Sequence, residues 1–198
     1  MTVIVNAKDL AHAFAVRGWS VSGGDTAELR IGDRVVVSFF GRRGPNFPFN
    51  LSGWITNDAI CVAYTVISHP NKRRAESVPV VRSDYITIDK QVASDEDVDR
   101  GCAALIDWAS KADLDPGIAA LLDKDANGRG IMPMHHLAAL AATGGVEALQ
   151  GYADAFAAGD RAGFVPYITA DHVVGALEFA KQRRADPDWL PRYPSLGV

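Results

Sequence analysis

The sequence is poor in cysteine, in positive charge and in long apolar runs, and each shortage excludes a class of protein. Its two cysteines, Cys61 and Cys102, stand among apolar residues, which predicts buried free thiols rather than a disulfide framework. The 20 basic and 24 acidic side chains leave a net charge of −4, whereas a dedicated nucleic-acid binder is normally basic. No window reaches the roughly 18 apolar residues of a membrane span, and the first residues lack the basic stretch of a signal peptide. We therefore expect a cytoplasmic protein with no nucleic-acid partner and no membrane association.

Motifs of common enzymes are also missing. The sequence has no Gly-x-Ser-x-Gly, no reactive cysteine paired with a histidine by spacing, and no glycine-rich phosphate loop. Gly23 and Gly24 are not followed by a predicted helix, so they cannot present a helix N-terminus to a phosphate. We expect no cofactor and, as the first hypothesis, no catalysis. An enzyme whose site assembles from distant residues is the alternative.

Alternation of apolar and polar residues between positions 27 and 66 predicts an antiparallel β-meander. Its predicted strands are residues 27–31, 34–40, 49–56 and 59–67, with a fifth strand at 84–88. In the first strand Leu29 and Ile31 share one face, as the period of two requires. Gly32 and Asp33 tolerate the positive φ of a tight hairpin turn. Short turns between neighbouring strands favour antiparallel pairing.

The predicted fourth strand, residues 59–67, has one bulky face and one small face. Ile60, Val62, Tyr64 and Val66 alternate with smaller residues such as Cys61. We expect the bulky face to meet the helices, because a sheet buries its apolar side.

Helical periodicity surrounds the meander. Residues 6–18 form the first predicted helix, capped by Asn6 and ended by Gly18. A long helix is predicted to begin at Ser94, which forms a near capping box with Asp97. Shorter helices are predicted within residues 115–122, 134–142, 146–158 and from Thr169 on, where Arg183 and Arg184 complement the C-terminal end of the last helix.

These elements predict an α+β fold. We expect an antiparallel sheet of about five strands with an N-terminal helix and a C-terminal set of helices packed on one face. Residues 1–198 are interpreted as a single domain, with the sheet and flanking helices in residues 1–112 and a helical extension and tail in residues 113–198.

One segment matches the first half of a calcium-binding loop. Asp123, Asp125 and Asn127 place oxygen ligands at alternate positions before Gly128. The twelfth position of the loop is Met134 rather than a bidentate glutamate, so the ligand set is incomplete. The same residues make a good turn after a helix, and we predict such a turn without bound metal.

The five histidines do not indicate a zinc site. His135 and His136 are adjacent and point to different faces of a predicted helix, unlike an i, i+4 pair. His12, His69 and His172 are scattered along the chain. We interpret the histidines as solvated or core-edge residues.

Two basic turns are the candidate binding surface. Their residues, with a neighbouring aromatic, are Arg42, Arg43, Phe47, Lys72, Arg73 and Arg74. If both turns connect strands of the meander they share one edge of the sheet, where they would attract an acidic partner. The alternative is that exposed turns carry charge for solubility and to block edge pairing.

The order of elements (one helix, a meander, then helices) is similar to that of small bacterial α+β proteins that bind one other protein. Toxin-neutralising immunity proteins and secretion chaperones are among them. The resemblance concerns topology and transfers no residue. It implies a non-enzymatic protein-binding module, with an acidic protein as the partner that the basic turns would select.

Overall fold

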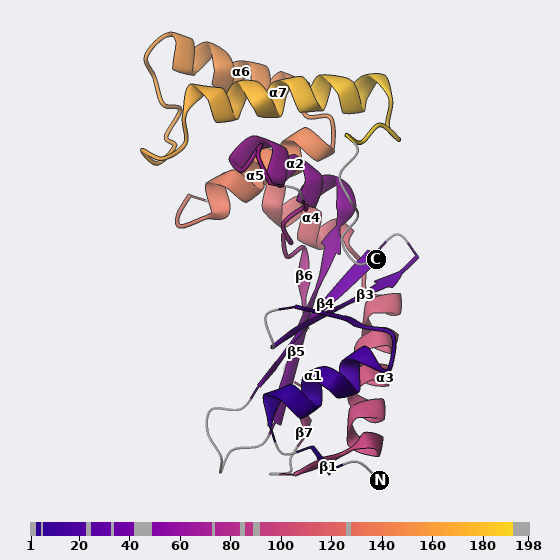
Figure 1. The fold of residues 1–198 in the computed structure, drawn as a ribbon. Coiled ribbons are helices and arrows are strands. Elements are labelled where there is room, and N and C mark those ends of the chain that lie inside the picture. The colour runs from indigo at the N-terminus through magenta and orange to yellow at the C-terminus, as the bar shows by residue number, and fades with distance from the viewer. Residues whose placement is uncertain are drawn as a thin grey trace. The chain divides into compact units, whose positions relative to one another are not determined.

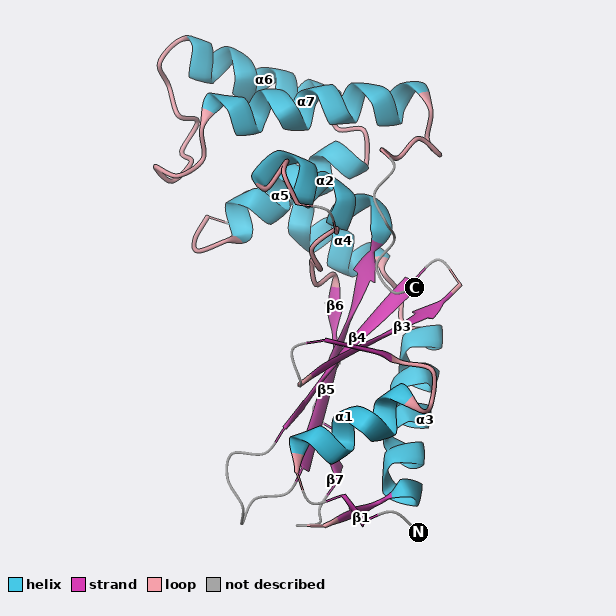
Figure 2. Ribbon diagram, in the orientation of Figure 1, coloured by secondary structure: helices cyan, strands magenta, loops and turns pink. Residues whose placement is uncertain are grey.

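The computed structural model describes residues 3–4, 6–22, 25–32, 34–41, 49–72, 74–83, 86–88, 92–125 and 128–191. They form two compact units. The sheet unit holds the described residues up to Thr56 together with those of Pro79–Asp113, and the helical unit holds those of Asn57–Val78 together with those from Leu114 on. The predicted fold class is confirmed, because an antiparallel sheet is combined with an N-terminal helix and several C-terminal helices (Figure 2).

The sheet unit contains ten elements in its described residues. They are β1 (Val3–Ile4), α1 (Ala7–Ala15), β2 (Ser20–Ser22), β3 (Thr26–Ile31), β4 (Arg34–Gly41), β5 (Phe49–Asn57), β6 (Val81–Arg82), β7 (Ile86–Ile88), β8 (Ala93–Ser94) and α3 (Asp95–Lys111). The main sheet has the order β2-β3-β4-β5-β6, β7 also pairs with β5, and β1 pairs with β8. β3 and β4 form a hairpin in which Ile31 faces Arg34. Gly32 turns this hairpin with a φ of +60°, which a glycine adopts without strain.

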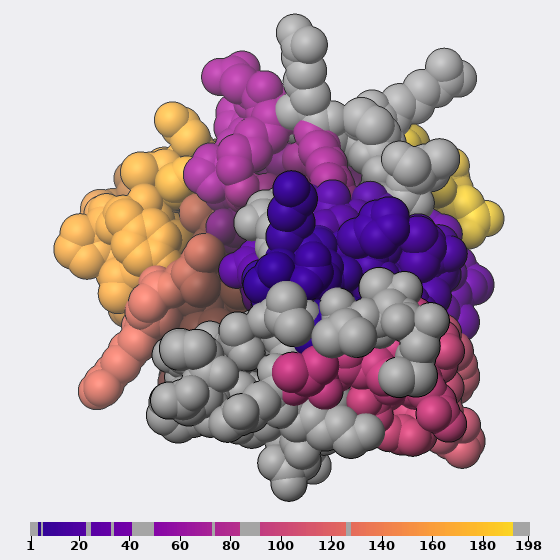
Figure 3. Space-filling view, turned by 60° about the horizontal axis from the view of Figure 1, so that its bottom comes forward, coloured from indigo at the N-terminus to yellow at the C-terminus, as the bar shows by residue number. Residues whose placement is uncertain are grey.

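Helices α1 and α3 both pack on β4 and also contact each other. The indigo residues of the N-terminal part of the chain and the magenta-pink residues of α3 both reach the surface of the face that Figure 3 shows. Phe14 of α1 stacks on Phe40 of β4 at 4.9 Å between ring centroids. Gly53 of β5 makes room for α3, because a Cβ at Gly53 would lie 3.1 Å from Leu105 Cδ2. Arg17 then joins the two helices, donating from Nε to Asp99 Oδ1 at 2.6 Å. In this unit the helices that pack on the sheet are α1 and α3.

The prediction that residues 59–67 form a strand is wrong, because they lie in helix α2 (Asp58–Ser68). Asn57 caps this helix by accepting the N–H of Ile60 at 3.1 Å. Within the helix, the Thr65 hydroxyl donates to the Cys61 carbonyl at 2.8 Å. Most residues of α2 are buried, so the segment is apolar on nearly all sides. A helix of that kind lacks the polar face that would have shown a period of 3.6.

The helical unit is built around one central helix. Its elements are α2, α4 (Asp115–Leu122), α5 (Met132–Ala142), α6 (Val146–Ala157) and α7 (Ala170–Ala185). α5 contacts the other four, and every residue from Pro133 to Ala142 is buried. α6 and α7 lie side by side (Figure 1). Within the described residues, no helix has both the length and the apolar character needed to cross a bilayer.

Candidate functional site

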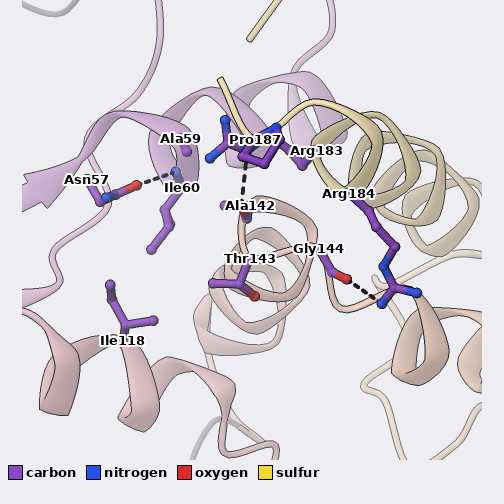
Figure 4. Close-up of a pocket in the computed structure, with 10 residues that line it drawn as sticks. All are labelled: Asn57, Ala59, Ile60, Ile118, Ala142, Thr143, Gly144, Arg183, Arg184 and Pro187. Carbon is purple, nitrogen blue, oxygen red and sulfur yellow. Dashed lines mark hydrogen bonds between the residues drawn. The ribbon is translucent and has the colours of Figure 1, made fainter. Parts of the chain in front are cut away.

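A cavity of about 580 Å³ opens in the helical unit, where the start of α2 meets the ends of α5 and α7 (Figure 4). Its volume is in the range of pockets that hold a small ligand or a side chain. Its described lining residues are Asn57, Ala59, Ile60, Ile118, Ala142, Thr143, Gly144, Arg183, Arg184 and Pro187. The cavity therefore combines apolar carbon with two guanidinium groups.

Arg183 is half-buried and held in place by two hydrogen bonds. Its Nε donates to the carbonyl of Ala142 at 3.2 Å, at the end of α5 (Figure 4). Its Nη1 donates to the carbonyl of Trp189 at 3.1 Å. A guanidinium has five N–H donors, and the Nη2 group of Arg183 bonds to no described residue. Donors of the fork thus remain available to a ligand.

Arg184 is already paired with a carboxylate. It bonds both carboxylate oxygens of Glu147 and donates from Nη2 to the Gly144 carbonyl at 2.7 Å. The bonds from Arg184 lower the pKa of Glu147 to about 2. Charge at this end of the cavity is therefore neutralised within the protein, whereas Arg183 has no ion pair with any described residue.

The chemistry of the lining favours binding over proton transfer. Among its described lining residues the cavity has no histidine, cysteine, lysine, tyrosine or acidic residue. Arginine stays protonated at any physiological pH, so it cannot act as a general acid or base, but it binds carboxylate and phosphate groups well. The arrangement suits recognition of an anion.

The predicted basic turns do not contribute described residues to this cavity. Outside the described residues lie Arg42, Arg43, Phe47 and Arg73. Lys72 and Arg74 are exposed, and Lys72 forms an ion pair with Glu76. The premise that these two residues follow a strand is wrong, because they follow α2. A shared basic patch stays a prediction.

The segment compared with a calcium loop is a turn after α4. Asp123 is the C-cap of that helix, and its Oδ1 accepts the N–H of Asp125 at 3.0 Å. This bond is an Asx turn, which explains the residue types without a metal. Asn127 lies outside the described residues. The residues that the structure describes include no cluster of three or more histidine, cysteine or acidic side chains that could hold a metal ion.

His136 is a core histidine with both ring nitrogens bonded. It is 1 % exposed, with Nδ1 3.0 Å from the Leu121 carbonyl and Nε2 3.2 Å from the Tyr152 hydroxyl. Because a carbonyl can only accept, Nδ1 carries the proton and Nε2 accepts from Tyr152. Burial lowers the pKa of His136; nearby Lys124 acts in the same direction, against the Leu121 bond and the charge of Asp123.

This lowered pKa predicts that acid destabilises the helical unit. Unfolded His136 takes up a proton near its ordinary pKa of 6.5, whereas folded His136 does so at lower pH. Its contribution to stability is therefore complete above pH 6.5 and is lost as pH falls from 6.5 toward the folded-state pKa. We expect the free energy of unfolding, measured by urea titration, to fall between about pH 7.5 and 5.5. His136→Gln should flatten this slope; an unchanged slope would contradict the assignment.

A further set of titratable side chains comes together where the end of α2 and the residues after it meet α5. His69 Nε2 lies 3.3 Å from Glu76 Oε2. The Tyr64 ring is 6.1 Å from that of His69 and 5.2 Å from that of His135. Burial, followed by the charge of Glu76, raises the pKa of Tyr64. The sequence does not predict the contact between Tyr64 and His135, because that contact depends on how α2 packs on α5.

Comparison with protein families places most of the chain within one family model. The model of a family described as "Family of unknown function (DUF6990)" matches residues 6–181. No curated protein and no solved structure matches the chain.

Proposed function

The chain belongs to this family of unknown function, DUF6990, and we propose that it is a non-enzymatic module that binds another protein. The cavity of the helical unit carries the proposal. Its charged described lining residues are Arg183 and Arg184, and of these only Arg184 pairs with a carboxylate among the described residues. A permanently charged guanidinium with free donors binds an anion and transfers no proton. An acidic protein partner is consistent with this arrangement.

We further propose that the chain is an immunity-type or secretion-chaperone-like protein of the cytoplasm. The order of elements predicted from the sequence resembles that of bacterial immunity proteins and secretion chaperones, which bind one other protein. The structure departs from this order where α2 follows β5, but the N-terminal helix, the antiparallel sheet and the C-terminal helices remain, and we propose this functional class for the chain. We propose a cytoplasmic location, because Cys61 and Cys102 are both buried and neither forms a disulfide. Free buried thiols are typical of a reducing compartment.

Affinity capture from the native host tests the binding function. The tagged full-length protein should retain one dominant partner in near-stoichiometric amount, since an obligate binding module has a specific ligand. The yield should fall as salt rises if the contact is electrostatic. A capture indistinguishable from that of an unrelated tagged protein of similar charge would contradict the proposal.

An enzyme without a recognisable sequence motif is the second candidate. It is favoured by the pairing of His69 with Glu76 at 3.3 Å beside Tyr64. A carboxylate orients an imidazole for acid–base work. Glu76 also forms an ion pair with Lys72, which competes for the same carboxylate. If His69→Ala keeps its fold but no longer captures the partner, the functional site is the group of His69, Glu76 and Tyr64 and not the cavity.

A further inference from the structure

We propose that the cavity at the ends of α2, α5 and α7 receives a carboxylate side chain from an acidic segment of the partner protein, with Arg183 as its charged contact. The inference rests on the protein-binding function proposed above and names the chemistry of the contact. It concerns the helical unit alone, whose cavity is drawn in Figure 4.

The guanidinium of Arg183 is prepared for a ligand. Bonds to the carbonyls of Ala142 and Trp189 fix its position, while the Nη2 group keeps its donors. An arginine that is already ordered loses less conformational entropy on binding than a free one. These bonds also explain why the residue stands at a helix end, where cations satisfy terminal carbonyls. Arg183 therefore uses Nε and Nη1 to bond the two carbonyls and has Nη2 left to bond a ligand.

The adjacent arginine shows which anion this geometry accepts. Arg184 binds the carboxylate of Glu147 through two of its nitrogens. Bidentate pairing is the strong form of the arginine–carboxylate contact. Arg183 stands next along the helix and has no such partner among the described residues. A carboxylate from the partner protein would bond Arg183 as the carboxylate of Glu147 bonds Arg184.

The apolar part of the lining favours a side chain on a peptide over a free anion. Ile60, Ile118 and Pro187 line the cavity with the arginines. A glutamate or aspartate side chain has aliphatic carbon next to its charge, and the flanking peptide has more. This carbon can pack against the apolar lining residues. Free phosphate has no carbon to bury. The first turn of α2 also reaches the cavity at Ala59.

Ala59→Glu tests the proposal without touching either arginine. Ala59 is the second residue of α2 and lines the cavity. A carboxylate there would be tethered within reach of Arg183 and would occupy the place of the external one. Because a negative charge in the first turn of a helix is favourable, A59E should fold at least as stably as the wild type. Ala59→Gln adds the same bulk without charge, so the A59E to A59Q ratio isolates the electrostatic effect.

The measurement is fluorescence anisotropy of a rhodamine-labelled hexaglutamate peptide at low salt. We expect A59E to bind it about tenfold or more weakly than A59Q. Glu147→Gln, which releases Arg184, should strengthen binding about two- to threefold, an effect that damage to the fold does not produce. Lys181→Gln removes a cation from α7 that does not line the cavity, so it should change the affinity less than twofold. A hexaglutamine peptide should bind about tenfold more weakly than hexaglutamate.

Two results would overturn the inference. Equal affinities of A59E and A59Q would show that Arg183 does not carry the contact. Displacement of the peptide by free glutarate at concentrations near the peptide's own Kd would make the cavity a site for small dicarboxylates instead. The capture experiment separates this failure from that of the binding function. If A59E captures the partner as well as the wild type does, the protein is a binding module but the contact lies outside the cavity. If the wild type captures no partner, the binding function itself is refuted.

Discussion

Phe14→Ala lowers the free energy of unfolding of the sheet unit by about 3–5 kcal/mol, the cost of removing a large aromatic from a packed core. Phe14 is fully buried between two rings. It stacks on Phe40 at 4.9 Å and meets the edge of Trp19 at 5.2 Å. The remaining cavity cannot collapse easily, because both neighbours are themselves buried. A loss of this size is a large part of the roughly 5–15 kcal/mol that holds a domain together.

Urea unfolding followed by tryptophan emission measures this loss, since Trp19 reports on the same cluster. Val16→Ala is the matched control. Val16 is 65 % exposed and directly follows α1, so its truncation should cost less than about 0.5 kcal/mol. A Phe14→Ala loss of no more than about 1 kcal/mol would show that α1 is not packed on the sheet as described.

Leu137→Ala is expected to cost the helical unit about 2–5 kcal/mol. Leu137 is fully buried in α5, the helix that contacts α2, α4, α6 and α7. Truncation there removes contacts from the centre of the unit rather than from its rim, where neighbours could shift to fill the gap. We therefore expect an effect near the upper end for a leucine.

Chemical denaturation followed by far-ultraviolet circular dichroism measures this change, because the helical unit holds most of its described residues in helices. Ile131→Ala provides the comparison: Ile131 precedes the same helix and is 52 % exposed. It should cost less than about 1 kcal/mol. Equal losses for the two variants would mean that α5 is not the centre of the unit.

Local signals in the sequence predict much of this fold because they act over a few residues. Asn6 accepts the N–H of Asp9 at 2.9 Å, as a helix cap should. Ser94 and Asp97 form the capping box that begins α3. Alternation predicts β3 and β4, and Gly32 makes their turn. Each of these features depends on neighbours in the chain, so the sequence displays it directly.

Features that depend on tertiary packing are the ones that sequence reasoning missed. α2 is apolar on nearly all sides, and alternation alone cannot separate such a helix from a strand. β2 (Ser20–Ser22) is not predicted from the sequence. It exists through its pairing with β3, where Ser20 faces Glu28.

The cavity could not be predicted either, because its walls come from four helices. The sequence predicts Arg183 and Arg184 at the end of the last helix, where the structure has them, and Arg184 bonds a carbonyl, that of Gly144. That carbonyl, however, follows α5 rather than α7. The two adjacent arginines before Pro187 are explained in the sequence by the negative end of the helix dipole, so they gave no separate signal of a cavity.

Comparative capture tests the central claim most directly. Wild-type and A59E proteins, tagged identically, would be used as baits in extracts of the native host, and the retained proteins quantified by mass spectrometry. The account predicts one protein that the wild type retains in near-stoichiometric amount and that A59E retains at least about tenfold less. A wild-type bait that retains no protein in stoichiometric amount would contradict it.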